Sequence, residues 1–132
     1  MDPETAAHYA GLILLAQAAF TQVEYSTDAT PERFILRLQA RYGRHRIFVT
    51  ELVSQGVRKY QYYVLSGNWI EAGFDNSPDP RALRLKYGRV GEEYVGELIP
   101  HLHRENKTLL FLTEGMTFSS FTHWLQSNIP PN

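Results

Sequence analysis

From residue 33 onward, apolar and polar residues alternate with a period of two, which is typical of strands with one buried face. In the segment 33–41 the even-numbered residues are apolar, and most of the odd-numbered residues are arginine. Comparable segments, separated by short turns, follow at 44–53, 57–66 and 69–75. Four strands joined in this way predict an antiparallel meander. We expect its core to contain Phe34, Leu36 and Leu38.

The turn at Gly67-Asn68 sets the register of the last two strands, because glycine supplies the positive φ that a two-residue hairpin requires. If Ser66 pairs with Trp69, Tyr62 lies opposite Gly73 on one face of the hairpin. The other face is the more apolar and is predicted to be the core, with Tyr63, Leu65, Ile70, Ala72 and Phe74. This register predicts that Tyr62 is exposed.

Two segments at the ends of the chain are predicted to be helices. Residues 3–20 are largely apolar and follow Asp2, which suits a capped helix start with proline in the first turn. Residues 117–128 place four large apolar side chains on one stripe: Phe118, Phe121, Trp124 and Leu125. We expect Phe121 and Trp124 to be buried.

The remaining segments are shorter. Residues 21–27 and 108–113 are predicted as strands, and 81–87 as a helical turn. Residues 94–103 are ambiguous, because Pro100 opposes a continuous helix through them. The prediction is a single α+β domain over residues 1–132. It has an antiparallel meander of four or more strands, with an N-terminal and a C-terminal helix packed on the sheet.

The charges are distributed unevenly along the 132 residues, although the formal net charge is only −1. Residues 31–89 hold eleven Lys and Arg against five Asp and Glu, whereas residues 1–30 hold no base. Arginine and tyrosine together on a sheet face favour single-stranded nucleic acid, because arginine holds phosphate and tyrosine stacks on a base. A solvated sheet face explains the same pattern. The residues proposed to bind nucleic acid are Arg33, Arg37, Arg41, Arg44, Arg58, Lys59 and Tyr62.

His101 and His103 form an H-x-H pair, and in an extended segment both rings point to the same side. Such a pair suits acid–base catalysis, metal binding or simple packing. For catalysis, the residues expected to stabilise phosphate charge are Arg84, Lys86 and Arg46. For a metal, the third ligand would be Asp75 or Glu97, although Asp at a turn start more often caps that turn. We expect no metal and no cofactor.

Tyr60 to Asn76 combine a Tyr-x-Tyr-Tyr strand with a hairpin and the stretch Gly73-Phe74-Asp75-Asn76-Ser77-Pro78, and a His-x-His pair follows. Over about residues 33–103 this pattern resembles the TumE-type toxins of toxin–antitoxin modules. The run Leu83-Arg84-Leu85-Lys86-Tyr87 stands where that family has a His-rich, Lys-containing run. The resemblance implies a cytoplasmic toxin with a cognate antitoxin as partner.

Three functions are consistent with these observations. The first is a toxin-like, metal-independent endoribonuclease that uses the His pair on RNA. The second is a non-catalytic module whose basic sheet face docks nucleic acid or an acidic protein. The third is a small-molecule pocket between sheet and helices. The chain lacks cysteine, which fits a reducing compartment, and its apolar residues 6–20 are too few to span a membrane. We therefore expect a cytoplasmic protein that contacts no membrane.

Overall fold

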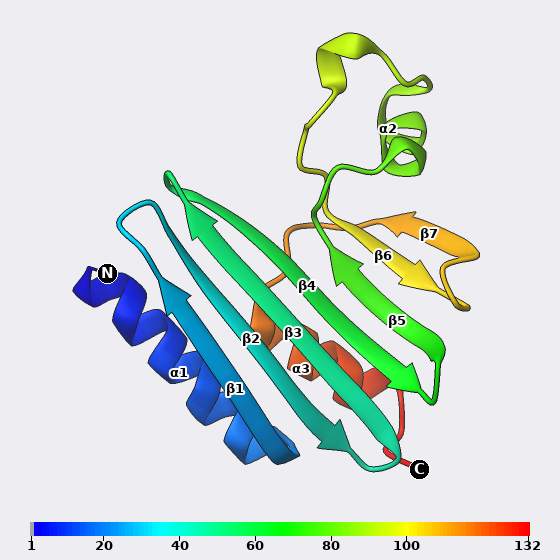
Figure 1. The fold of residues 1–132 in the computed structure, drawn as a ribbon. Coiled ribbons are helices and arrows are strands. Elements are labelled where there is room, and N and C mark those ends of the chain that lie inside the picture. The colour runs from blue at the N-terminus through cyan, green and yellow to red at the C-terminus, as the bar shows by residue number, and fades with distance from the viewer. Residues whose placement is uncertain (1) are drawn as a thin grey trace.

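The computed structural model describes residues 2–132 and contains a seven-stranded sheet (Figure 1). The strands follow one another across the sheet in chain order, and each pairs antiparallel with the next. They are β1 (Thr21–Ala29), β2 (Arg33–Tyr42), β3 (His45–Ser54), β4 (Val57–Ser66), β5 (Trp69–Asp75), β6 (His101–Arg104) and β7 (Leu109–Leu112). The helices are α1 (Pro3–Ala19), α2 (Pro80–Tyr87), the short η1 (Glu92–Tyr94) and α3 (Phe118–Asn128). The predicted α+β meander with a helix near each end is confirmed.

Helices α1 and α3 cover one face of the sheet, which we call the inner face (Figure 1). Helix α1 contributes Tyr9, Leu12 and Ala16 to the core, and α3 contributes Phe118, Phe121 and Leu125. The strand residues predicted to be buried, Phe34, Leu36 and Leu38, lie beneath them at 5%, 0% and 1% exposure. Trp124 is only half-buried, at the edge of this core.

The register of the β4–β5 hairpin differs from the prediction. Ser66 does pair with Trp69, but the pairing shifts at Glu71, so that Tyr62 lies opposite Phe74. One extra residue in a strand reverses the faces of all residues beyond it. The prediction that Tyr62 is exposed is therefore wrong: its side chain lies on the inner face, fully buried. Tyr63 and Leu65 point to the opposite face and are half-buried.

The outward positions of β2, β3 and β4 form the open face, which neither α1 nor α3 covers. Helix α2 packs elsewhere, against β7, where Ala82 and Leu83 contact Ile99 and Leu110. Along β2 the exposed arginines at 33, 37 and 41 lie on the open face, as the alternation predicts. Within residues 2–132, no helix is long and apolar enough to cross a membrane.

Candidate functional site

The two predicted histidines meet an aspartate where β5 pairs with β6. Strand β6 begins directly after Pro100, and its register places His101 opposite Asp75 and His103 opposite Gly73. The two imidazole rings are 4.8 Å apart between centroids and nearly perpendicular. One ligand-type atom from each of Asp75, His101 and His103 lies within 4.8 Å of the others. We call these three residues the DHH cluster.

Neighbouring groups hold the members of the DHH cluster in place. The backbone N–H of Ser77 donates to Asp75 Oδ1 at 2.6 Å, so the predicted capping of this turn by Asp75 is confirmed. The hydroxyl of Tyr63 donates to Asp75 Oδ2 at 3.2 Å. The ring nitrogen Nδ1 of His101 lies 2.6 Å from the carbonyl oxygen of Ile99. A carbonyl only accepts, so this nitrogen carries the proton and Nε2 has a free lone pair when the ring is neutral.

The start of α2 brings two more charged side chains to the cluster. Asp79 caps the helix by accepting from the N–H of Arg81, and its Oδ2 lies 3.9 Å from His101 Nε2. The guanidinium of Arg81 lies 3.5 Å from Nδ1 of His103 and also donates to the carbonyl of Lys107 at 2.7 Å. The sequence does not predict that residues 79–81 lie near the histidines, because about twenty residues separate the two segments along the chain.

Burial dominates the chemistry of the DHH cluster. The exposed fractions of His101, His103 and Asp75 are 1%, 3% and 6%. Burial lowers the pKa of His103 to about 4, and the electrostatic effects of His101, Lys107 and Arg81 act in the same direction. His103 is therefore neutral at neutral pH. A polymer such as RNA has no direct access to either ring.

The cations predicted to assist the histidines lie elsewhere. Arg46 is on β3, two strands away from the β5–β6 pair, where its guanidinium lies 5.1 Å from the centre of the Phe48 ring. Lys86 pairs with Glu97 at 3.4 Å, and Arg84 is exposed on α2. Glu97 also accepts from the Tyr87 hydroxyl, so of the two ligand candidates only Asp75 joins the histidines.

Most of the predicted nucleic-acid-binding cations do share one surface. Arg33, Arg37 and Arg41 of β2 and Lys59 of β4 are exposed on the open face. Arg44 lies in the adjoining β2–β3 turn, where it contacts the Ser66 hydroxyl.

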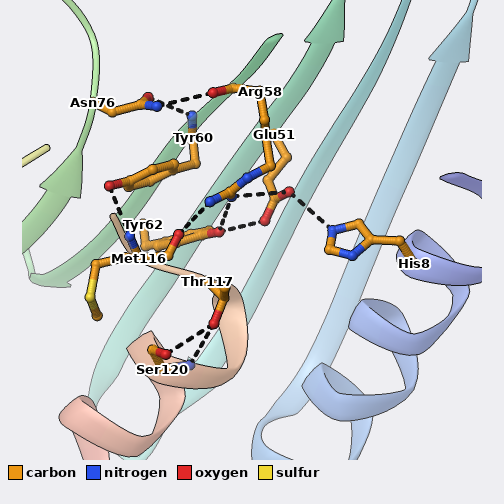
Figure 2. Close-up of polar contacts among 9 residues, drawn as sticks. All are labelled: His8, Glu51, Arg58, Tyr60, Tyr62, Asn76, Met116, Thr117 and Ser120. Carbon is orange, nitrogen blue, oxygen red and sulfur yellow. Dashed lines mark hydrogen bonds and ion pairs between the residues drawn. The ribbon is translucent and has the colours of Figure 1, made fainter. Parts of the chain in front are cut away.

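Arg58 and Tyr62 do not belong to this surface, because both serve a buried acid on the inner face (Figure 2). Glu51 of β3 is fully buried and accepts from the Tyr62 hydroxyl at 2.5 Å. Arg58 Nη1 lies 3.5 Å from Glu51 Oε1, and His8 of α1 approaches the same oxygen at 3.5 Å. The structure therefore does not bring Arg58 and Tyr62 together with the other predicted nucleic-acid-binding residues: they lie on the opposite face, where Arg58 Nη1 donates to the Tyr62 hydroxyl at 3.0 Å and Nη2 donates to the Met116 carbonyl.

A cleft of about 380 Å³ opens beside this network, between the start of α1 and the sheet. His8, Tyr9 and Arg58 line it together with the acids Asp2 and Glu4. The two acids disfavour a phosphate there, because like charges repel. The cleft lies between sheet and helix, as the small-molecule hypothesis requires, but no convergent set of free polar groups distinguishes it.

Comparisons with protein-family models, curated proteins and solved structures return no match.

Proposed function

We propose that this protein is a binding module for single-stranded RNA and that the RNA lies on the open face. The observation that carries the proposal is the charge on that face. The outward positions of β2, β3 and β4 hold five basic side chains, Arg33, Arg37, Arg41, Arg46 and Lys59, and no acidic one. The acids Glu24 and Asp28 of β1 border this face, and Asp28 pairs with Arg33 at 3.7 Å, which leaves four of the cations without that acid. Such a surface attracts phosphate even though the whole chain has a net charge of −1.

The open face also offers aromatic side chains to bases. Phe48 and Tyr63 are half-buried at outward positions, and they pair across the strands β3 and β4. Each has a cation near its ring, Arg46 at 5.1 Å for Phe48 and Lys107 at 5.3 Å for Tyr63. Stacking on such rings tolerates any base, so we expect binding with little sequence preference.

Burial of the histidines favours binding over cleavage. An acid–base ribonuclease needs both groups within hydrogen-bond reach of the sugar and the leaving oxygen. His101 and His103 are instead enclosed beneath the start of α2, and Arg84 and Lys86 are not among their contacts. The non-catalytic module is therefore the function that this geometry supports best.

The resemblance to TumE-type toxins extends this proposal to a cellular location and a second partner. We propose that the protein acts in the cytoplasm and binds an antitoxin as well as RNA. An antitoxin with an acidic segment would compete with RNA for the open face. The lack of cysteine agrees with a reducing compartment.

The test is the affinity for a fluorescent single-stranded RNA of mixed sequence, measured by anisotropy at low salt. The double variant Arg37→Glu/Arg41→Glu reverses two charges on the β2 strand of the open face. We expect it to bind at least tenfold more weakly than the wild type. Arg84→Glu/Arg89→Glu makes the same charge change on and just beyond α2, and we expect it to bind like the wild type. Equal losses of RNA affinity in both variants would show that RNA binding depends on the net charge of the chain and not on the open face.

The same RNA is then analysed on a denaturing gel, with and without EDTA. We expect the RNA to stay intact while bound. Cleavage that falls by ~10²–10⁴ in His101→Ala or His103→Ala would establish the ribonuclease instead. Absence of binding at low salt by a folded wild type would refute the binding module.

A further inference from the structure

We infer that Asp75, His101 and His103 bind one divalent transition-metal ion, with Zn²⁺ as the best match, and that Asp79 completes the site from α2. The inference does not rest on RNA binding, because the site uses none of the five cations of the open face and shares with that face only Tyr63, whose hydroxyl donates to Asp75. Two imidazole nitrogens and carboxylate oxygens are a ligand set that suits zinc and related ions.

The backbone arranges the three ligands before any ion arrives. Asp75 and His101 are direct cross-strand partners, and His103 is two residues further along the same face of β6. Their ligand-type atoms lie within 4.8 Å of one another. Bonds of about 2.0–2.2 Å to a tetrahedral ion require separations of about 3.5 Å. Small rotations of the side chains around a bound ion provide this closure.

The outer contacts of His101 are those that a metal-binding histidine needs. Its Nδ1–H donates to the Ile99 carbonyl, and this contact fixes the ring and directs the Nε2 lone pair away from that carbonyl. Oδ2 of Asp79 lies 3.9 Å from that Nε2. In the neutral ring, both atoms are acceptors, so a cation between them converts a repulsive contact into two favourable ones.

Asp79 can bind the ion because only one of its two carboxylate oxygens is used in capping α2. Oδ1 accepts from the N–H of Arg81 at the helix start, and this leaves Oδ2 toward the histidine. An ion bound by all four residues would be closed off by protein, as structural zinc ions are. It would fix the start of α2 to the sheet.

Arg81 competes with the ion. Its guanidinium lies 3.5 Å from His103 Nδ1, and its positive charge opposes a second cation at that place. Binding therefore moves the arginine away, while its second contact, the Lys107 carbonyl, lies outside the DHH cluster. This gives a specific expectation, since removing the arginine should strengthen metal binding.

The experiment is a calorimetric titration of the chelator-treated full chain with Zn²⁺, which gives the heat of binding, the affinity and the number of ions bound per chain. We expect one ion per chain and a higher melting temperature with Zn²⁺. His101→Asn, His103→Asn and Asp75→Asn should each weaken binding at least tenfold. Arg81→Met should strengthen it several-fold, and His123→Asn, which changes a histidine on α3 away from the site, should leave it unchanged.

A second measurement uses the wild type alone, in case a variant does not fold. Co²⁺ should give the visible absorption of a four-coordinate ion and should broaden the NMR signal of Gly73, next to His103 in the register, but not that of Gly11 in α1. Failure of the folded wild type to bind Zn²⁺, or unchanged affinity in folded His101→Asn/His103→Asn, would overturn the inference. An octahedral Co²⁺ spectrum without an effect on Gly73 would do so as well.

Discussion

At the scale of single residues, His103 shows how strongly its surroundings control charge. The ring is 3% exposed, stacks near Tyr63 and lies near basic side chains from three elements: His101 in β6, Lys107 in the following turn and Arg81 in α2. Asp79 acts in the opposite direction. The sum of these effects lowers the pKa of His103 from 6.5 to about 4.

This pKa predicts a defined dependence of stability on pH in the metal-free protein. Between pH 6.5 and pH 4 the unfolded chain binds a proton at residue 103 and the folded chain does not. The free energy of unfolding therefore rises with pH across this window and falls as the solution is acidified. The full difference is about 3 kcal/mol, from about 1.4 kcal/mol for each pKa unit.

Urea denaturation from pH 4 to pH 7, in the presence of a chelator, measures this effect. His103→Asn should remove most of the slope between pH 6.5 and pH 5. His123→Asn serves as the control and should keep it, because that residue is exposed on α3. A slope that is the same in all three proteins would show that His103 is not the group responsible.

At the scale of secondary-structure elements, alternation was sufficient for the strands but not for the whole register. The period of two in residues 33–41 correctly predicted which face of β2 is buried, because that strand pairs regularly with β3. The same reasoning failed for Tyr62 and Tyr63, since the irregularity near Glu71 inserts one residue into β5. A bulge depends on contacts between strands, and these are not visible in local sequence.

The candidate site divides in the same way. The H-x-H pattern indicated that His101 and His103 share a side, and Asp75 was one of two candidate third ligands. The contributions of Asp79 and Arg81 depend on how the segment 76–100 folds back over β6, and no local pattern in that segment predicts this path. One signal was overlooked: Glu51 falls at an apolar-face position of its strand, between Val49 and Val53. An acid there requires a buried partner.

Glu51 joins three elements, and its removal should be costly for that reason. Glu51→Ala would remove the acceptor of the Tyr62 hydroxyl and the ion-pair partner of Arg58, whose guanidinium keeps its hydrogen bond to the Met116 carbonyl (Figure 2). We expect a loss of about 2–3 kcal/mol in the free energy of unfolding, below the usual range for a fully buried pair, because Arg58 is partly exposed.

Glu51→Gln is the matched variant. It keeps an oxygen that accepts from Tyr62 and removes only the charge, so its loss should be smaller than that of Glu51→Ala. Urea denaturation of both variants at pH 7 gives the comparison. If Glu51→Ala were as stable as the wild type, the contacts of Glu51 would contribute nothing to stability.

At the scale of the whole molecule, the two faces of the sheet have different tasks. The inner face is covered by α1 and α3 and supplies the hydrophobic core. The open face has no such cover across β2–β4 and carries the cations instead. The acids are concentrated toward the chain ends, with four in residues 1–30 and five in residues 90–132. Two of them, Glu24 and Asp28 of β1, border the open face beside β2, and Asp28 pairs with Arg33 at 3.7 Å. The basic face is therefore not apparent in the net charge of −1.

This separation predicts how RNA binding responds to salt. Each phosphate neutralised on a single strand contributes about −0.7 to the slope of log affinity against log salt concentration. Five basic side chains on the open face give a slope of up to about −3.5. A molecule that bound through its net charge of −1 would not be attracted to RNA at all, so a steep negative slope requires a local cluster of cations. The variant Arg37→Glu/Arg41→Glu then tests whether this cluster is the open face. We expect this slope when the RNA affinity is measured from low to moderate NaCl concentration. In Arg37→Glu/Arg41→Glu the slope should be less negative by at least 1. Binding that is independent of salt would mean that stacking and apolar contacts, rather than these cations, hold the RNA.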